Sequence, residues 1–265
     1  MVFLSAGGSD EPAEHSTKVS DQSAAMMQQG AAGPTPAAPL HVTYYTDPLC
    51  CWSWALEPEW SRLRRALVGR MAWRQRMGGM IKRWDRFDDP LNAIHRPAQM
   101  GPLWMQAERQ TGVRIENRVW TEDPPDSSWP ACLAFKAAEL QSPFAGDLYL
   151  KRMRHKLFVE SRNIARREIL SEIAAECASL SDGRFDAARW ERAMRGDKAK
   201  RAFQKDVADA HLRGIGRFPT LIIKRPGGSE RVLTGWRPYE KLIEEVFVLV
   251  PEFRSSVGSP QTESA

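Results

Sequence analysis

The segment Asp47-Pro48-Leu49-Cys50-Cys51-Trp52-Ser53-Trp54 holds the side chains best suited to chemistry. It follows residues 41–46, a β-branched and aromatic run that predicts a buried strand, and it leads into a helical pattern. Cys50 is thereby placed at a helix N-terminus, where unpaired N–H groups and the helix dipole favour thiolate over thiol. The sequence predicts that Cys50 is a nucleophile.

The spacing is that of a Cys-x-x-Cys redox motif in which Ser53 occupies the position of the second cysteine. A dithiol pair resolves its own mixed disulfide, whereas a Cys-x-x-Ser site must be released by an outside thiol. Cys51 is a poor replacement, because adjacent Cα atoms lie about 3.8 Å apart and disulfides usually need roughly 4.4 to 6.8 Å. We predict a monothiol site, with Cys132 and Cys177 buried in apolar helical stretches.

Composition separates a globular body from its ends. The chain has 265 residues, of which 42% are hydrophobic and 27% charged, enough for a substantial core. Residues 1–39 are rich in Ala, Gly, Ser, Gln and Pro and predict a disordered tail, as do residues 251–265. The N-terminal tail lacks a signal-peptide core and contains no arginine, so we expect a cytoplasmic protein. No stretch approaches the roughly 18 apolar residues that a membrane span needs.

The charge pattern gives little support to a nucleic-acid partner or a metal. Net charge is +5, a modest excess for this length, and the densest basic run, residues 151–156, predicts a solvated helix face. The histidines and cysteines show no spacing typical of metal ligands, so we expect no metal site.

The remaining pattern orders the elements around the motif. Strands are predicted over 41–46, 72–77, 220–224 and 231–234, and a helix kinked at Pro58 over 51–68. Helices are predicted over 131–141, 146–160, 166–179, 185–194, 199–212 and 238–249, with loops over 85–101 and 121–130. The order predicts an α/β thioredoxin-like fold with a large inserted helical domain: core residues 40–79 and 214–250, insert residues 80–213.

The motif residues resemble the DsbA-like thioredoxin-fold family, in the branch whose motif is Asp-Pro-Leu-Cys-x-Trp-Cys-Trp. The following segment, residues 55–60, is similar as well, and Phe218-Pro219-Thr220 looks like the family's cis-proline loop. The resemblance covers roughly residues 41–250. It implies that Pro219 is cis and that the backbone beside it faces the active-site sulfur and pairs with an extended substrate.

The resemblance implies a thiol oxidoreductase that works through mixed disulfides with a thiol- or disulfide-containing protein, without a tightly bound cofactor and with glutathione as a co-substrate. Cys50 would be the nucleophile, Ser53 would donate a hydrogen bond to it, and Pro219 would shape the groove. Arg217 is a candidate contact for an anionic ligand, with a solvated loop arginine as the alternative. The other candidate substrate contacts are Trp52, Trp54, Phe218 and Thr220.

Two alternatives remain open at this point. The branch includes bacterial protease-adaptor relatives that use the fold to grip a protein partner, for which a missing second sulfur is harmless. Six tryptophans could line such a surface, although burial in the core is the commoner fate of such residues: Trp52, Trp54, Trp84, Trp104, Trp120 and Trp129. A glutathione-dependent transferase or isomerase of the kappa kind shares the inserted helices, but those relatives usually have serine where Cys50 stands.

Overall fold

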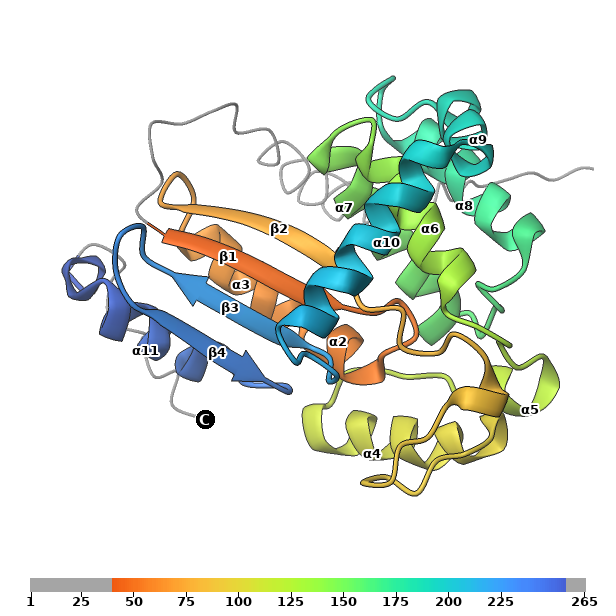
Figure 1. Ribbon diagram of the computed structural model, residues 1–265, viewed down its shortest axis with the longest axis horizontal. Coiled ribbons are helices and arrows are strands. Elements are labelled where there is room, and N and C mark those ends of the chain that lie inside the picture. Colours follow the sequence, from red (N-terminus) through yellow and green to blue (C-terminus); the bar gives the residue numbers. More distant parts are fainter. Residues whose placement is uncertain (1–39, 256–265) are drawn as a thin grey trace, which may run out of the picture. The chain divides into compact units, whose positions relative to one another are not determined.

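The computed structural model describes residues 40–255, so the predicted tail over residues 1–39 lies outside the described part of the chain. The four strands form one sheet in the order β2-β1-β3-β4 (Figure 1). β1 (Leu40–Thr46) pairs in parallel with β2 (Met71–Met77) and antiparallel with β3 (Thr220–Lys224), which pairs antiparallel with β4 (Glu230–Thr234). All four strands were predicted to within one residue at each end.

Helices cover both faces of this sheet. α3 (Glu57–Ala66) and α11 (Tyr239–Leu249) pack on one face through a core that includes Val42, Trp60 and Ile223. On the other face, Tyr45 and Ile222 pack against α10 (Asp197–Leu212), which crosses the sheet in Figure 1. Alternate strand residues point to opposite faces, which is why Tyr44 and Tyr45 enter different cores. The fold is thioredoxin-like with inserted helices, as predicted.

The single helix predicted over residues 51–68 is divided into two helices in the structure. α2 (Cys51–Ala55) ends after five residues, and α3 begins at Glu57. Pro58 lies in the first turn of α3, where its missing N–H has no helical partner to lose. The predicted kink is therefore a break at Leu56, and α2 is short.

The segment between β2 and β3 is helical. Its further members are α4 (Met100–Thr111), α5 (Val119–Glu122), α6 (Trp129–Glu139), α7 (Pro143–Phe158), α8 (Arg167–Leu180) and α9 (Ala187–Arg195), with short 3₁₀ turns at Trp84–Arg86 and Pro97–Gln99. The two predicted loops are wrong in part, because α4 and α6 begin inside them and α5 overlaps the second. No helix was predicted where α4 and α5 lie. Pro102 and Pro130 lie in the first turns of α4 and α6, where proline is tolerated.

Two of the six candidate surface tryptophans, Trp104 and Trp120, lie in the core, and the other four are half-buried. Trp104 and Trp120 are buried and meet edge to face, with ring centroids 5.1 Å apart. Trp104 also packs against Phe158 at 4.5 Å. These rings fasten α4, α5 and α7 together, so they are unavailable as a partner surface.

Two further predictions are wrong. The basic run over residues 151–156 is not wholly a solvated face, because Arg154 and Lys156 are buried. The predicted tail from residue 251 is ordered as far as residue 255: a 3₁₀ turn at Pro251–Phe253 packs the Phe253 ring into the core. No helix within residues 40–255 is both long enough and apolar enough to cross a bilayer.

Candidate functional site

Cys50 lies at the junction between β1 and α2, as the sequence predicts. Its N–H donates to the Asp47 carbonyl at 3.1 Å, and its own carbonyl accepts from the N–H groups of Ser53 and Trp54, both at 3.1 Å. The turn and the first helical bonds together fix the position of the sulfur. Cys50 is the N-cap residue of α2.

The Cys50 sulfur faces the loop that precedes β3. The Phe218–Pro219 peptide bond is cis, as the resemblance implied. The Cys50 Sγ donates to the Phe218 carbonyl oxygen at 3.2 Å, although the two residues are 168 positions apart in the chain. The Phe218 ring in turn covers Gly78 just after β2, where a Cβ would overlap it. The Phe218 loop therefore packs against both the Cys50 thiol and the segment after β2.

The thiol form of Cys50 is favoured, contrary to the prediction from its place at a helix start. The side chain is 5% exposed, and this burial raises the pKa of Cys50 above its ordinary value, with the Asp47 carboxylate adding to the effect. Ser53 and the Arg154 charge act in the opposite direction but are outweighed. α2 has only five residues, so few peptide dipoles align behind the sulfur. Desolvation prevails for this reason.

Ser53 lies where the prediction places it, beside the sulfur. It is fully buried, and its hydroxyl has no hydrogen-bond partner within the described residues. The hydroxyl is near enough to the sulfur to lower the pKa of Cys50, and a hydroxyl donor favours the thiolate over the thiol. Ser53 is thus a ready donor for a charge that burial otherwise opposes.

Asp47 ties the motif to the rest of the molecule. It is completely buried, and its two oxygens accept from the Leu49 N–H at 2.9 Å, the Met80 N–H at 2.7 Å and the Ser128 hydroxyl at 2.9 Å. Burial raises the pKa of Asp47 above its ordinary value, and these donors oppose that rise. One carboxylate therefore joins the motif, the segment after β2 and the start of α6.

Arg154 is a site residue that the sequence reasoning missed. It reaches from α7 to the other end of the motif, where Nη1 donates to Glu57 Oε2 at 2.7 Å and Nη2 donates to the Thr46 hydroxyl at 2.5 Å. Its positive charge lowers the pKa of Cys50. A signal for its burial was present, because Leu150 and Leu157 lie four residues before and three after it on one helix face.

None of the other three cysteines forms a disulfide with Cys50. All four cysteines are free and buried. Burial raises the pKa of Cys51 and Cys132 well above their ordinary value, and that of Cys177 to about 12. Cys132 donates to Asp47 Oδ2 at 3.5 Å, so it belongs to the structural network around that carboxylate. The site has one sulfur at the cis-proline loop.

The remaining predicted residues divide into two groups. Trp54 donates from its indole N–H to the Arg114 carbonyl at 3.0 Å and stacks on Phe158. Thr220 is buried and donates to the Arg217 carbonyl at 2.8 Å. Both residues thus hold the scaffold together. Trp52 and Phe218 are half-buried and Arg217 is exposed, so these three are available at the surface beside Cys50.

A family described as thioredoxin matches residues 44–242. The chain belongs to the thioredoxin family. A protein of Halalkalibacterium halodurans named ClpXP adapter protein SpxH is 26% identical to this thioredoxin-family chain over 219 residues, which cover 81% of this chain and 70% of that one. Its name places a protease adaptor among the similar proteins.

Solved structures agree on the fold. A putative protein disulfide isomerase from Nitrosomonas europaea superposes with a TM-score of 0.67 at 20% identity, covering 80% of this chain and 98% of that one. The cytosolic disulfide reductase DsbM from Pseudomonas aeruginosa, solved with GSH, gives a TM-score of 0.56 at 21% identity, covering 82% and 96%. These structures confirm the predicted thioredoxin-like fold.

Proposed function

We propose that this chain is a thioredoxin-fold adaptor that binds a protein partner through the surface beside Cys50. The carrying observation is the resting state of Cys50: its thiol is buried, bonded to the Phe218 carbonyl, and held at a raised pKa with Ser53 in the second motif position. Such a site keeps the geometry of a disulfide-exchange enzyme without its reactive thiolate. The name of the similar Halalkalibacterium halodurans protein supports an adaptor role.

The proposed binding surface is the segment from Leu212 to Phe218 together with Trp52. Leu212 is 87% exposed, an unusual exposure for a leucine. Arg217 is also exposed, Phe218 is half-buried with its carbonyl at the Cys50 sulfur, and Trp52, two residues after Cys50, is half-buried. Apolar and aromatic side chains with an arginine among them are the types that dominate protein–protein contacts. An extended partner segment lying along this loop would pass over the thiol.

In the test, full-length variants serve as baits, and the proteins that they retain from lysate of the source organism are compared. The affinity of each variant for the purified partner is then measured. We expect the wild type and Cys50→Ser to bind the same protein with similar Kd. We expect Leu212→Asp to weaken binding about tenfold or more, because an exposed carboxylate replaces an apolar contact. Val248→Asp is the matched control, because Val248 is 56% exposed on α11, which packs on the opposite face of the sheet. Loss of binding in Cys50→Ser would contradict the proposal.

A second candidate, monothiol disulfide exchange, is favoured by the placement of the Cys50 sulfur at a cis-proline loop. The Cys50 thiolate would attack one sulfur of a substrate disulfide, forming a mixed disulfide and releasing the other sulfur as a thiolate. A glutathione thiolate would then attack the substrate sulfur of the mixed disulfide, so that Cys50 leaves as a thiolate and a substrate–glutathione disulfide is formed. The buried Arg154 charge and the Ser53 donor would stabilise the thiolate that leaves. This exchange needs the reducing cytoplasm that we propose as the location.

Glutathione-linked reduction of a model disulfide separates the two candidates. An adaptor gives the same slow rate for the wild type and Cys50→Ala. A monothiol reductase loses its activity in Cys50→Ala, while Cys177→Ala, a substitution of another buried cysteine, leaves it unchanged.

A further inference from the structure

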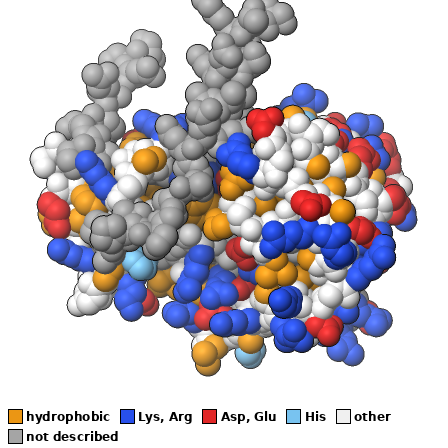
Figure 2. Space-filling model, turned by 90° about the horizontal axis from the view of Figure 1, so that it is seen from above, with side chains coloured by type: hydrophobic (Ala, Val, Ile, Leu, Met, Phe, Trp, Pro, Cys, Tyr) orange, Lys and Arg blue, Asp and Glu red, His pale blue; other side chains and the backbone are white. Residues whose placement is uncertain are grey.

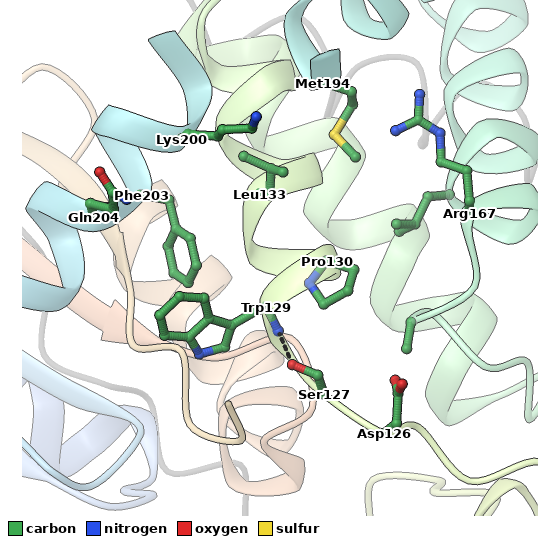
Figure 3. Close-up of a pocket in the computed structure, with 12 residues that line it drawn as sticks. Asp126, Ser127, Trp129, Pro130, Leu133, Arg167, Met194, Lys200, Phe203 and Gln204 are labelled. Atoms are coloured by element: carbon green, nitrogen blue, oxygen red, sulfur yellow. Dashed lines mark hydrogen bonds between the residues drawn. The ribbon is translucent and has the colours of Figure 1, made fainter. Parts of the chain in front are cut away.

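The insert contains a cavity that the site around Cys50 does not use. Its volume is about 670 Å³, and it lies among α6, α8, α9 and α10. This volume falls within the range of roughly 300 to 1,000 Å³ that is usual for small-molecule sites. Figure 3 shows the side chains of these helices converging on it.

One wall of the cavity is apolar. Trp129, Pro130 and Leu133 of α6 form one side, and all three are only half-buried in the structure. Phe203 of α10 packs edge to face on Trp129, with ring centroids 5.1 Å apart, and the Trp129 indole donates to the Gly79 carbonyl at 3.1 Å. The aromatic wall is therefore fixed in place before anything binds. An alkyl or aryl group would remove its exposed surface from water.

The charges around the cavity differ between its two ends. Lys200 of α10 and Arg167 of α8 reach toward one another near Met194, whereas Asp126 lies at the far end (Figure 3). Arg167 pairs with Glu191, but Lys200 forms no ion pair with any residue from 40 to 255. A single anionic group would be attracted to the first end and repelled from the second.

The surface around the cavity also favours an anionic ligand. Figure 2 shows many Lys and Arg side chains over the half of the molecule that the insert helices form, with apolar side chains between them. Along α9 and α10, basic residues outnumber acidic ones, and the whole chain carries a net charge of +5. A basic field of this kind raises the local concentration of anions.

We propose that this cavity binds a small amphiphilic anion with an alkyl or aryl body and one carboxylate or sulfonate group. The body lies against Trp129, Leu133 and Phe203, and the anionic group lies at Lys200. A second anionic group at the far end is disfavoured by Asp126. No residue of the Cys50 motif lines the cavity, so the proposal does not depend on whether the chain is an adaptor or a reductase.

The test uses 8-anilinonaphthalene-1-sulfonate, an anionic aryl dye whose fluorescence rises when its rings leave water, with the full chain. We expect saturable binding of one dye per chain. Lys200→Glu should weaken binding about tenfold or more by replacing a charge-assisted contact with a repulsion. Lys205→Glu is the control on the same helix, because Lys205 is exposed and does not line the cavity. Leu133→Asp should abolish binding, with far-UV circular dichroism to confirm folding.

The neutral analogue N-phenyl-1-naphthylamine isolates the role of charge, because it has the same rings without the sulfonate. We expect it to bind about tenfold more weakly and to be insensitive to Lys200→Glu. Absence of saturable dye binding, or equal binding by all variants, would overturn the proposal. Equally tight binding of the neutral dye would mark an apolar groove that suits a protein segment, and self-association lost in Leu133→Asp would identify a second copy as the occupant; either result would also overturn it.

Discussion

The Cys50 thiol donates a hydrogen bond to the carbonyl oxygen of Phe218, which lies 3.2 Å away and next to a cis proline. The hydrogen bond uses the thiol proton, so it exists only in the neutral form of Cys50. A hydrogen bond to the neutral form favours that form. Burial acts in the same direction, because it raises the pKa of this residue. A thiol that is partnered at rest fits a site for binding better than a site poised to attack.

Gly78→Ala should disturb the Phe218 loop. A Cβ at residue 78 would overlap the Phe218 ring, so the loop must move, and overpacking of this kind costs about 1 to 3 kcal/mol. Urea unfolding measures the cost. Gly216→Ala is the control, because a Cβ there meets no atom within 4 Å, and its free energy of unfolding should stay within about 0.5 kcal/mol of the wild type. Equal stability of both variants would show that Phe218 does not depend on Gly78.

Arg154→Met should destabilise the fold strongly. It removes a fully buried guanidinium and leaves the Glu57 carboxylate and the Thr46 hydroxyl without their partner, a loss of about 3 to 5 kcal/mol. Arg152→Met is the control on the same helix, because Arg152 is partly exposed and its partner Glu176 keeps a second ion pair with Lys156. Its cost should be at most about 1 kcal/mol. Equal losses for the two variants would refute the role given to the buried pair.

Asp47→Asn should change how stability depends on pH. Burial raises the pKa of Asp47 in the fold above its ordinary value of 3.8, so above pH 3.8 the unfolded chain releases this proton more readily than the folded chain. The free energy of unfolding contributed by Asp47 therefore falls as pH rises from 3.8 toward the folded pKa. Asn lacks the titration, so the wild type should lose stability relative to Asp47→Asn over this window. A constant difference between the two proteins across pH 4 to 7 would contradict the raised pKa.

The sheet could be predicted from the sequence because its strands are short runs with strong local signals. Residues 41–46 and 220–224 are dominated by β-branched and aromatic side chains, and each is bounded by turn residues. α4 was not predicted, and the start of α6 was placed at residue 131 instead of 129. Pro102 and Pro130 stand in the first turns of these helices, where proline is tolerated, whereas further along a helix proline breaks it. Local pattern alone does not distinguish these two uses of proline.

The site was predicted in part, and the reason is physical. Cys50 lies beside Ser53 and beside the Phe218–Pro219 cis peptide, as the motif and the resemblance implied. The protonation of Cys50 depends on burial and on charges from Asp47 and Arg154, and Arg154 is distant in sequence. Desolvation is a property of the packed molecule, so the direction of this pKa shift could not be obtained from the motif.

The rate of iodoacetamide alkylation at Cys50 as a function of pH tests most directly whether this thiol is at rest or activated. Peptide mass spectrometry follows each cysteine, with buried Cys51 and Cys132 as internal controls that should react more slowly still. A midpoint above the ordinary cysteine value of about 8.5 is the result expected of an adaptor that has kept the fold of a disulfide-exchange enzyme. A midpoint well below about 8.5 would show an activated thiolate and would contradict it.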